Sequence, residues 1–475
     1  MRKVIHIIRY GTVAEKIHLE RTINTYDYLI INGNSAAFVS RAIAQFVVEK
    51  FFTQKEKRFI IDPITYAFQQ NIDLLKNKTK IGDVVLKKSI KKLIENYGEP
   101  ATKILDDNPI RPADFSDTLL MDEFCFKVLD FQYSIINKYI NNEELNKYLE
   151  YASELSLEQF HPKLLIAPYF YLNHNDPDFN NWLDRNIQFL NLSIKHSKNS
   201  FSNLPVFGQI VINKNILLNE EYVLRIIEAY NNCDCSGINI WVDGLDEHED
   251  NQKILTGFIN FLSKIKRKEI YNMYGGFFSI LLTHKSLKLL SGVSHGMEYG
   301  ENREVYPVGG GIPVSKYYYY PLHQRKDFSK AYFLLRHEGI LDETLDDLGN
   351  TNRYYSEICE CPKCKNIMGE SMSNFAKFES TEYYEVRNKY SVSRRKKPTA
   401  ETKENCLHHY LLCKKIEFDT VRTKNVEEII AMLQIEKEKY INCKDISNNE
   451  FSYIDNWCNS ISEYLNERRI KKQYD

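Results

Sequence analysis

The chain has 475 residues, of which 43% are apolar, 13% aromatic and 27% charged. These proportions are typical of a globular protein and exclude disordered, collagen-like and disulfide-stapled chains. The 63 Lys and Arg residues nearly balance the 64 Asp and Glu residues, and a formal net charge of −1 excludes a whole-protein field that would attract a polyanion. Any nucleic-acid site must therefore be a local patch. No run of about 18 apolar residues occurs, so the sequence predicts a soluble, cytoplasmic protein with no membrane association.

Short apolar runs rich in Ile, Val, Phe and Tyr alternate with helical patterns through the first 300 residues, which is typical of strands in a parallel sheet. Eight βα units close most economically as an α/β fold of the (β/α)₈ TIM-barrel type, whose active site gathers at the C-terminal ends of the strands. No G-x-G-x-x-G follows the first run, which disfavours an open doubly wound sheet. The eight expected strands are Lys3–Arg9, Tyr28–Ile31, Arg58–Asp62, Lys163–Tyr169, Pro205–Ile212, Gly237–Val242, Gly276–Leu282 and one near Met297–Tyr299.

The stretch between Asp62 and Lys163 is too long for one βα unit. It predicts a helical insertion near residues 70–150, with helices at Leu86–Tyr97 and Ser116–Asn141. Three parts are expected along the chain: a barrel catalytic domain over residues 1–345, a zinc-binding subdomain over 346–430 and a C-terminal helical tail over 431–475.

Cysteines are clustered, and in a reducing compartment tight spacing favours a metal site over a disulfide. Cys359, Cys361 and Cys364 place three thiolates within six residues, as a tetrahedral Zn²⁺ site requires. With a fourth protein ligand the ion would be saturated and its role structural. The pair Cys233 and Cys235 has no such partner and is expected to be two ordinary thiols. The fourth ligand is open among His408, His409, Cys406 and Cys413, with His409 the preferred candidate.

Carboxylates follow several of the expected strands. Asp62 ends the run Arg58–Ile61, Asp243 ends the run at Val242, and Glu301 follows the last strand. A single aspartate in such a place is often only a helix N-cap. Several carboxylates at one end of a barrel can act together, because displacement at a sugar carbon needs one nucleophile and one acid or base.

These features together resemble the tRNA-guanine transglycosylases. The three cysteines after an eight-stranded barrel carry most of the resemblance, with a His-His pair at the start of a later helix. Asp62–Gln69 is similar to the family's Asp-Ser-Gly-Gly-Phe-Gln loop, and Phe207–Gln209 to the strand that offers a Gln to the base. Gly292–Glu301 is similar to the last barrel unit, where the family's nucleophilic aspartate would fall on Glu301.

The sequence also departs from that family. The loop after Asp62 lacks both glycines, Ile166–Tyr169 lacks the base-binding aspartate, and no histidine lies at the usual short distance after the cysteines. Such departures resemble the divergent DNA-modifying branch, the DNA 7-deazaguanine transglycosylases. That branch places a 7-deazaguanine base in DNA rather than in tRNA.

The resemblance implies a base exchange, in which a carboxylate attacks the anomeric carbon of a guanosine nucleotide and guanine leaves. A free 7-deazaguanine such as the 7-cyano base preQ0 then takes its place. Asp62 would be the acid/base or orienting group, with Asp243 or Glu301 as the nucleophile. The substrate-binding set would be Phe68, which stacks on the base, Gln209, which hydrogen-bonds its edge, and Gln69 and Gly208.

The expected polymer is DNA, with tRNA as the alternative, and proteins encoded nearby are possible partners. Two basic segments are candidates for phosphate contacts, Arg394–Lys397 in an expected exposed loop and His323–Lys326, although a short basic run is often only a solvated loop. Two rival interpretations remain: a barrel hydrolase or lyase with an unrelated structural zinc, and an inactive nucleic-acid-binding descendant.

Overall fold

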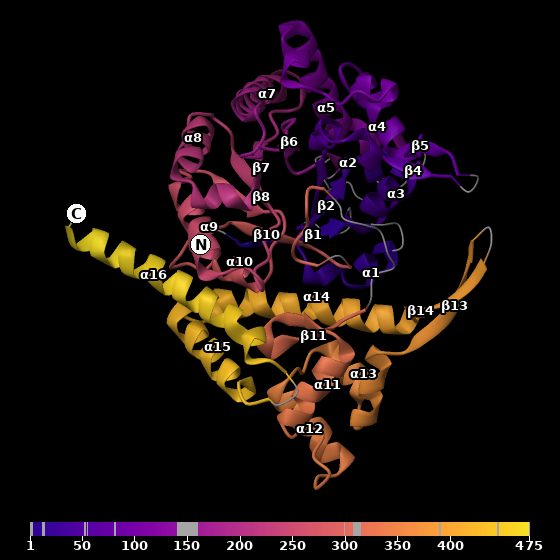
Figure 1. Ribbon diagram of the computed structural model, residues 1–475, viewed down its shortest axis with the longest axis vertical. Coiled ribbons are helices and arrows are strands. Elements are labelled where there is room, and N and C mark those ends of the chain that lie inside the picture. Colours follow the sequence, from indigo (N-terminus) through magenta and orange to yellow (C-terminus); the bar gives the residue numbers. More distant parts are fainter. Residues whose placement is uncertain are drawn as a thin grey trace.

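The computed structural model describes residues 3–11, 15–51, 54, 56–79, 82–139, 160–298, 300–306, 315–388, 391–443 and 446–474. Figure 1 shows an upper part built from the first 300 residues and a lower part built from the C-terminal third. The long helix α14 (Ala400–Thr423) runs along the boundary between them.

Eight parallel strands form one sheet that is nearly closed into a barrel, which confirms the predicted (β/α)₈ fold. The strand order is β3-β2-β1-β10-β9-β8-β7-β6. The strands are almost wholly buried, because helices cover their outer face and side chains fill the interior. They are β1 (Ile5–Tyr10), β2 (Tyr28–Asn32), β3 (Arg58–Asp62), β6 (Leu165–Ile166), β7 (Val206–Asn213), β8 (Gly237–Asp243), β9 (Glu269–Asn272) and β10 (Gly292–Gly296).

Side chains complete the barrel between its two end strands, β3 and β6. Thr65 Oγ1 donates to the carbonyl oxygen of Tyr169 at 2.6 Å and accepts from its N–H at 2.8 Å. Gln69 Nε2 donates to the carbonyl oxygen of Tyr171 at 3.0 Å, and Gln69 Oε1 accepts from its N–H at 2.8 Å. These four bonds, here called the barrel seam, add to a backbone bond from the Lys163 N–H to the Phe59 carbonyl oxygen at 2.8 Å, at an edge where β3 and β6 form no ladder. They satisfy buried backbone groups that would otherwise have no partner.

Helices of the barrel part follow its strands, and two short strands form a hairpin in the insertion after β3. The helices are α1 (Lys16–Arg21), α2 (Gly33–Phe38), α3 (Ser40–Phe51), α4 (Lys88–Tyr97), α5 (Thr118–Tyr139), α7 (Phe179–Ser200), α8 (Glu220–Asn231), α9 (Gln252–Lys264) and α10 (Phe277–Leu281), and the hairpin is β4 (Lys76–Lys78) with β5 (Val84–Leu86).

The C-terminal third contains two further hairpins and six helices within its described residues. Its strands are β11 (Tyr317–Tyr319), β12 (Gln324–Lys326), β13 (Thr381–Asn388) and β14 (Ser391–Pro398), and its helices are α11 (Phe328–His337), α12 (Asp347–Glu357), α13 (Pro362–Met368), α14, α15 (Val426–Tyr440) and α16 (Ser452–Tyr474). Among the described helices of the whole chain, none combines the length and the apolar character needed to cross a membrane.

The predicted positions of the last two barrel strands were wrong. Gly276–Leu282 contains helix α10, and the seventh strand is β9, which ends at Asn272. The eighth strand is β10 and ends at Gly296, before the expected Met297, while Tyr299 lies outside the described residues. Helix α10 is buried on all sides, so its apolar run cannot be distinguished from a buried strand by periodicity. Strand β10 contains Gly, Ser and His, and was therefore missed in a search for apolar runs.

The barrel seam gives a first testable prediction. Gln69→Ala would leave the N–H and C=O of the buried Tyr171 without partners, so we expect a loss of about 2–4 kcal/mol in the free energy of unfolding. Gln45→Ala is the matched control, since Gln45 is exposed on α3. Urea denaturation of both variants measures the difference. Equal midpoints for the two variants would contradict a structural role for Gln69.

Candidate functional site

Side chains from several strands converge at the C-terminal end of the barrel, here called the barrel mouth. Arg9, from β1, donates through Nη2 to Asp62 Oδ2 at 2.8 Å and to Asn32 Oδ1 at 2.7 Å. Arg9 and Asp62 are 4% and 1% exposed, so the ion pair is buried. Removal of one partner of such a pair leaves an uncompensated charge in the interior, which is strongly destabilising.

Asp62 is held at its other oxygen as well. The Tyr169 hydroxyl donates to Asp62 Oδ1 at 2.6 Å, and the Ile64 N–H donates to the same oxygen at 3.2 Å. Burial, and then the charge of Asp62, raise the pKa of Tyr169 well above its usual range, so the phenol stays a donor. Both oxygens of Asp62 are therefore held in place by donors. Sequence reasoning missed Arg9, although it stands near the end of its strand as Asp62 does.

Asp243, at the end of β8, has a different environment. Its Oδ2 accepts from the Tyr171 hydroxyl at 2.6 Å, and its Oδ1 accepts from the Val305 N–H at 2.7 Å. Within the described part of the chain, no Lys or Arg forms an ion pair with this carboxylate. Burial raises the pKa of Tyr171, and the hydrogen bond to Asp243 acts in the same direction. Asp243 is thus held by two neutral donors and has no cationic partner among the described residues.

The two aspartates are linked through one extended segment. Tyr169 and Tyr171 lie two residues apart after β6, and side chains two apart in an extended chain project to the same side. One hydroxyl binds Asp62 and the other binds Asp243. The structure therefore brings two of the three predicted catalytic carboxylates to the same end of the barrel.

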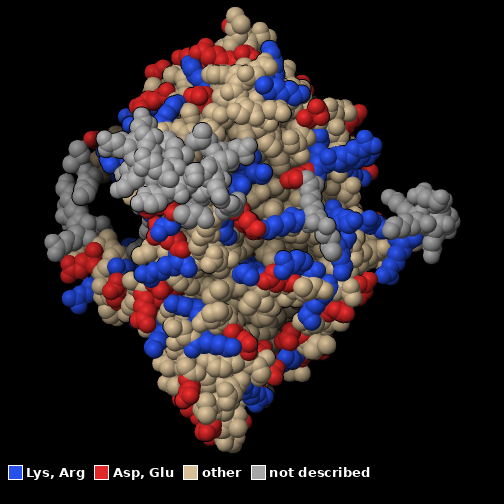
Figure 2. Space-filling view, turned by 180° about the vertical axis from the view of Figure 1, so that it is seen from behind, with Lys and Arg blue, Asp and Glu red and all other residues tan. Residues whose placement is uncertain are grey.

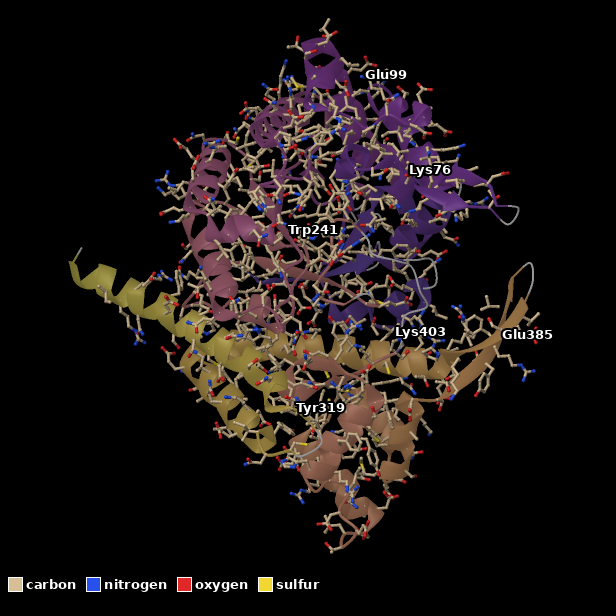
Figure 3. The ribbon with its side chains drawn as sticks, in the orientation of Figure 1. Lys76, Glu99, Trp241, Tyr319, Glu385 and Lys403 are labelled. Carbon is tan, nitrogen blue, oxygen red and sulfur yellow. The ribbon has the colours of Figure 1, made fainter. Side chains whose placement is uncertain are left out.

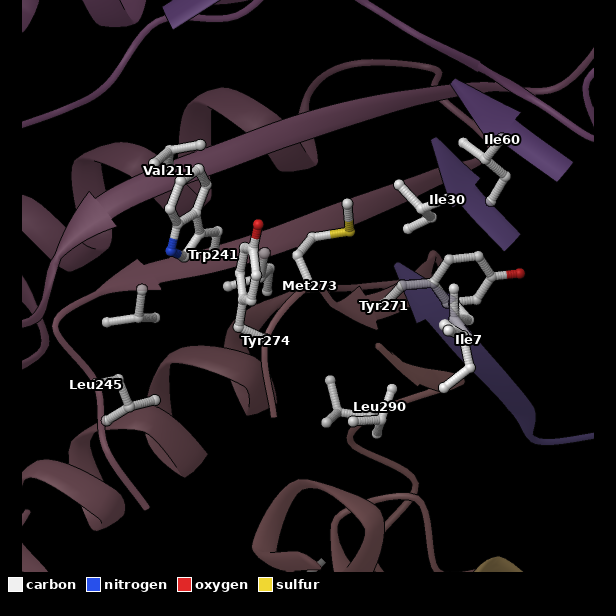
Figure 4. Packing of buried hydrophobic residues seen from close by; sticks show 14 of the residues in the cluster. Ile7, Ile30, Ile60, Val211, Trp241, Leu245, Tyr271, Met273, Tyr274 and Leu290 are labelled. Atoms are coloured by element: carbon white, nitrogen blue, oxygen red, sulfur yellow. The ribbon is translucent and has the colours of Figure 1, made fainter. Parts of the chain in front are cut away.

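Aromatic rings lie beside these carboxylates. The Tyr66 ring stacks on Tyr169 with centroids 5.7 Å apart and meets Trp241 edge-on at 5.2 Å. Trp241 in turn packs against Tyr274 at 4.9 Å, and Figure 4 shows these two rings side by side. The Arg9 guanidinium lies over the Tyr274 ring, 4.6 Å from its centroid. Planar groups of this kind are suited to stack on a nucleobase.

Residues 300–306 cross the barrel mouth. The Arg303 carbonyl oxygen accepts from Trp241 Nε1 at 2.9 Å, and Arg303 Nη1 donates to the Tyr274 hydroxyl at 3.3 Å. The Val305 carbonyl oxygen accepts from Gln70 Nε2 at 3.2 Å. Arg303 is exposed, so this segment places a cation at the solvent side of the aromatic rings.

Three of the predicted substrate-binding residues have structural contacts instead. Phe68 is fully buried and packs edge-on against Tyr97, with centroids 6.0 Å apart. Thr65–Gln69 is a 3₁₀ helix, and three residues per turn place Phe68 on the buried face with Thr65, whereas Tyr66 faces Trp241. Gln69 belongs to the barrel seam. Gly208 faces the outer helices, because a Cβ there would lie 3.0 Å from the Tyr230 ring.

Gln209 faces the barrel interior, since Gly208 before it faces outward. Its register partner on β8 is Asn239. Both side chains are 1% exposed, and neither their amide nitrogens nor their oxygens find a partner within the described structure. Each such buried group costs about 1–3 kcal/mol when it has no partner. Trp241, two residues after Asn239, lies on the same face of β8 and nearer to the C-terminal end of the strand.

Glu301, the third predicted catalytic carboxylate, contacts α14. Lys414 Nζ lies 2.6 Å from Glu301 Oε1, and the Tyr410 hydroxyl donates to the same oxygen at 3.1 Å. Lys414 also pairs with Glu417 at 2.9 Å. Burial raises the pKa of Glu247 to about 7, and the charge of Glu301 acts in the same direction. Glu301 thus belongs to a charged cluster between the barrel and α14, and none of its contacts is with Asp62 or Asp243.

A buried group of four residues in the C-terminal third can hold a metal ion. The ligand atoms of Cys359, Cys361, His409 and Cys413 all lie within 4.8 Å of one another. His409 Nε2 is 2.7 Å from the Tyr318 carbonyl oxygen, which directs Nδ1 toward the sulfurs. Burial lowers the pKa of His409, but the neighbouring thiols, Cys361 first, outweigh burial and raise it to about 10. The cluster therefore favours a positive charge at its centre.

The alternatives for the fourth ligand differ in position. His408 contacts His18, with ring nitrogens 3.3 Å apart, and the Cys406 sulfur donates to the Phe378 carbonyl oxygen at 3.5 Å. Neither is in the four-residue group. Cys413, one helical turn after His409, is in it. Cys364, the remaining predicted ligand, lies 3.3 Å from His409 Nδ1 and 3.1 Å from the Tyr354 hydroxyl.

The cluster predicts about one bound metal ion per chain. Cys361→Ala should remove the ion and expose the C-terminal third to proteolysis, because the ion joins α13 to α14. Elemental analysis by mass spectrometry measures the content, with Cys235→Ala as the control. Cys364→Ser and Cys413→Ser in the same assay identify the thiol that completes the set. Freshly purified protein with far less than one ion per chain would contradict the site.

Comparison with known proteins adds no further information: no protein-family model matches the chain, and no curated protein matches it.

Proposed function

We propose that the protein is a transglycosylase that exchanges guanine in DNA for a 7-deazaguanine such as preQ0, with a carboxylate as nucleophile. The observation that carries the proposal is the barrel mouth. There Asp243, with no cationic partner in the described structure, ends the strand that carries Trp241 two residues earlier, and Trp241 packs against Tyr66 and Tyr274. A nucleophile and a stacking surface for a planar base are what such an exchange needs. The Cys/His group that follows the barrel is the second support, because the transglycosylases that the sequence resembles carry a zinc site there.

Among the three carboxylates, Asp243 fits the nucleophile best. A carboxylate in a buried ion pair is a weak nucleophile, and Asp62 is paired with Arg9, while Glu301 is paired with Lys414. An oxygen of Asp243 would attack the anomeric carbon as the bond to guanine breaks, and guanine would leave with the bonding electrons and take up a proton. The incoming base would reverse these steps, losing its ring N–H proton and releasing Asp243. The target nucleotide must first leave the duplex stack.

Asp62 fits an orienting role, because Arg9 and Tyr169 hold both of its oxygens in place. The stacking role expected of Phe68 passes to Tyr66 and Tyr274. Gln209, together with Asn239, offers carboxamides that lack partners in the described structure, which suits the edge of a base. A base would reach them only after other side chains move, because Gln209 and Asn239 are each 1% exposed and the rings of Trp241 and Tyr274 are buried as well.

We infer that the metal is zinc, because a Cys-rich set with one His is typical of tetrahedral Zn²⁺. Four protein ligands would saturate the ion, so its role is structural. It would fix the cysteine loop and α13 to α14 on the side of the barrel.

The direct test of this function is a nucleoside analysis by mass spectrometry. Cells expressing the protein with its genomic neighbours should contain a deazapurine nucleoside in their DNA, and purified protein should bind the free base. If modified nucleosides are found only in tRNA, the substrate is tRNA and not DNA. Absence from both polymers, with no binding of the base, would favour a hydrolase or an inactive binding protein.

A further prediction uses isosteric variants to distinguish the candidate nucleophiles. Asp243→Asn can still accept from the Val305 N–H and bind the Tyr171 hydroxyl, so the fold should persist while base exchange falls by about 10³-fold or more. Glu301→Gln should keep exchange within a few-fold of normal, because Lys414 retains Glu417 as its partner and the amide oxygen still accepts from Tyr410. Turnover with a labelled free base measures both. The opposite pattern would make Glu301 the nucleophile.

A further inference from the structure

Strands β13 and β14 form a two-stranded ribbon, here called the arm, that projects from the body of the protein (Figure 1). Its register runs from Thr381 opposite Pro398 to Asn388 opposite Ser391, and it pairs with no other described strand. Figure 3 shows Glu385 on this ribbon, well away from the barrel residue Trp241. An isolated two-stranded ribbon is only marginally stable in water, so the arm is suited to a partner that covers it.

The basic run Arg394–Lys397 lies on β14, whereas the sequence suggested an exposed loop. Successive residues of a strand point to opposite faces, so a run of four puts two cations on each face. Arg394 and Lys396 share one face with Tyr383, which is 67% exposed, and with Glu385, which lies opposite Arg394 in the register. The other face carries Arg395 and Lys397 and is less exposed. The arm thus offers one open face with two cations, one carboxylate and an aromatic ring, and it carries further cations on the face behind.

Positive charge on the arm is only partly compensated. Lys397 pairs with Glu382 at 2.9 Å, and Lys396 Nζ lies 5.6 Å from the Tyr383 ring centroid. Arg394 and Arg395 form no ion pair with any residue that the structure describes. Elsewhere the surface is mixed, and Figure 2 shows acidic and basic side chains interspersed over the face in view. The arm is therefore a local basic element on a protein of nearly zero net charge.

The other basic candidate, His323–Lys326, is used inside the protein. His323 pairs with Glu417 at 2.7 Å, and the Arg325 guanidinium lies 3.8 Å from the centroid of the Tyr410 ring. Lys326 is 4% exposed. This segment joins the barrel to the C-terminal third and is not free to bind a polymer.

We propose that the arm inserts into the major groove of duplex DNA. The Tyr383 face would lie toward the base edges, with Arg394 and Lys396 on neighbouring phosphates and Arg395 reaching a groove wall. The major groove of B-form DNA is about 12 Å wide and admits a two-stranded ribbon. The major groove of A-form RNA is deep and narrow and excludes one. The geometry of the arm therefore favours a DNA duplex over an RNA duplex.

The inference rests on the proposed function for the choice of polymer and adds how that polymer is held. Contacts in the groove and to phosphates would fix the duplex while one nucleotide leaves the stack. The barrel mouth then needs no basic surface of its own beyond Arg303. With the duplex held by the arm and the base held by the barrel mouth, a protein with a formal net charge of −1 can act on a polyanion.

The test compares Arg394→Gln/Lys396→Gln with the control Lys266→Gln/Arg267→Gln. The control pair is exposed in the loop before β9, at the opposite end of the barrel from the mouth, and its loss changes the charge equally. Fluorescence anisotropy would measure binding to a 20-base-pair DNA duplex and to the RNA duplex of the same sequence over a range of salt concentrations. Circular dichroism would check that both variants are folded.

We expect the unmodified protein to bind the DNA duplex more tightly than the RNA duplex. The arm variant should lose about tenfold in DNA affinity, reduce the salt slope by about 2 and lose most of the preference for DNA. The control should change neither affinity nor slope appreciably. Equal affinity for both duplexes in the unmodified protein, or equal losses in arm variant and control, would overturn the proposal.

Failure of this inference is distinguishable from failure of the proposed function. Suppose that base exchange in DNA is detected and that the arm variant binds DNA normally. This result would refute the role of the arm in DNA binding and leave the proposed function intact. Binding that depends on the arm, without exchange in DNA or tRNA, would refute the function and leave the arm as a DNA-binding element.

Discussion

A buried lysine fixes the relation between the barrel and the C-terminal third. Lys414 is fully buried on α14 between Glu301, which follows the last barrel strand, and Glu417 on its own helix. Burial alone would lower the pKa of Lys414, but the two carboxylates outweigh it and raise the pKa above its usual range. Buried charges are tolerated only when they are paired in good geometry, so this cluster determines both the position and the rotation of α14.

The rotation of α14 has consequences on both of its sides. Tyr410 and Lys414 lie one turn apart and face the barrel, whereas His409 and Cys413, also one turn apart, face the cysteine loop. The same helix thus carries the contact with the barrel and half of the metal group. The chain that enters α14 is the arm, so the anchoring of this helix also sets the direction in which the arm leaves the protein. The fold, the candidate metal group and the direction of the arm therefore depend on one element.

The sequence was sufficient to predict the barrel and some of the residues of each candidate site. β1, β2, β3, β7 and β8 are long apolar runs and were found, while β9 and β10 are short or polar and were misplaced. The cysteine run predicted the metal group, but His408 and His409 are neighbours on one helix, and only their contacts distinguish them. Cys413 was readable as the residue one turn after His409.

The barrel mouth was harder to predict. Asp62 and Asp243 follow apolar strands and were visible, but their partners, Arg9, Tyr169 and Tyr171, become neighbours only when the barrel closes. Phe68 was expected to stack on the base because it matched a motif by residue type. The 3₁₀ turn at that place packs Phe68 against Tyr97, away from the mouth, and Tyr66, two residues earlier and also buried, contacts Trp241. Phe68 matches the family's loop by residue type, but the local backbone conformation decides where each ring of the loop lies.

The central claim is that Asp243 becomes covalently linked to the sugar during base exchange. The most direct measurement is the intact mass of the protein after acid quenching of a reaction with a short DNA duplex and no incoming base. The account predicts an adduct equal to the oligonucleotide strand without one guanine, located by peptide mapping on the segment that contains Asp243 and absent in Asp243→Asn. An adduct on the Glu301 segment, or no adduct under conditions in which exchange is measured, would contradict it.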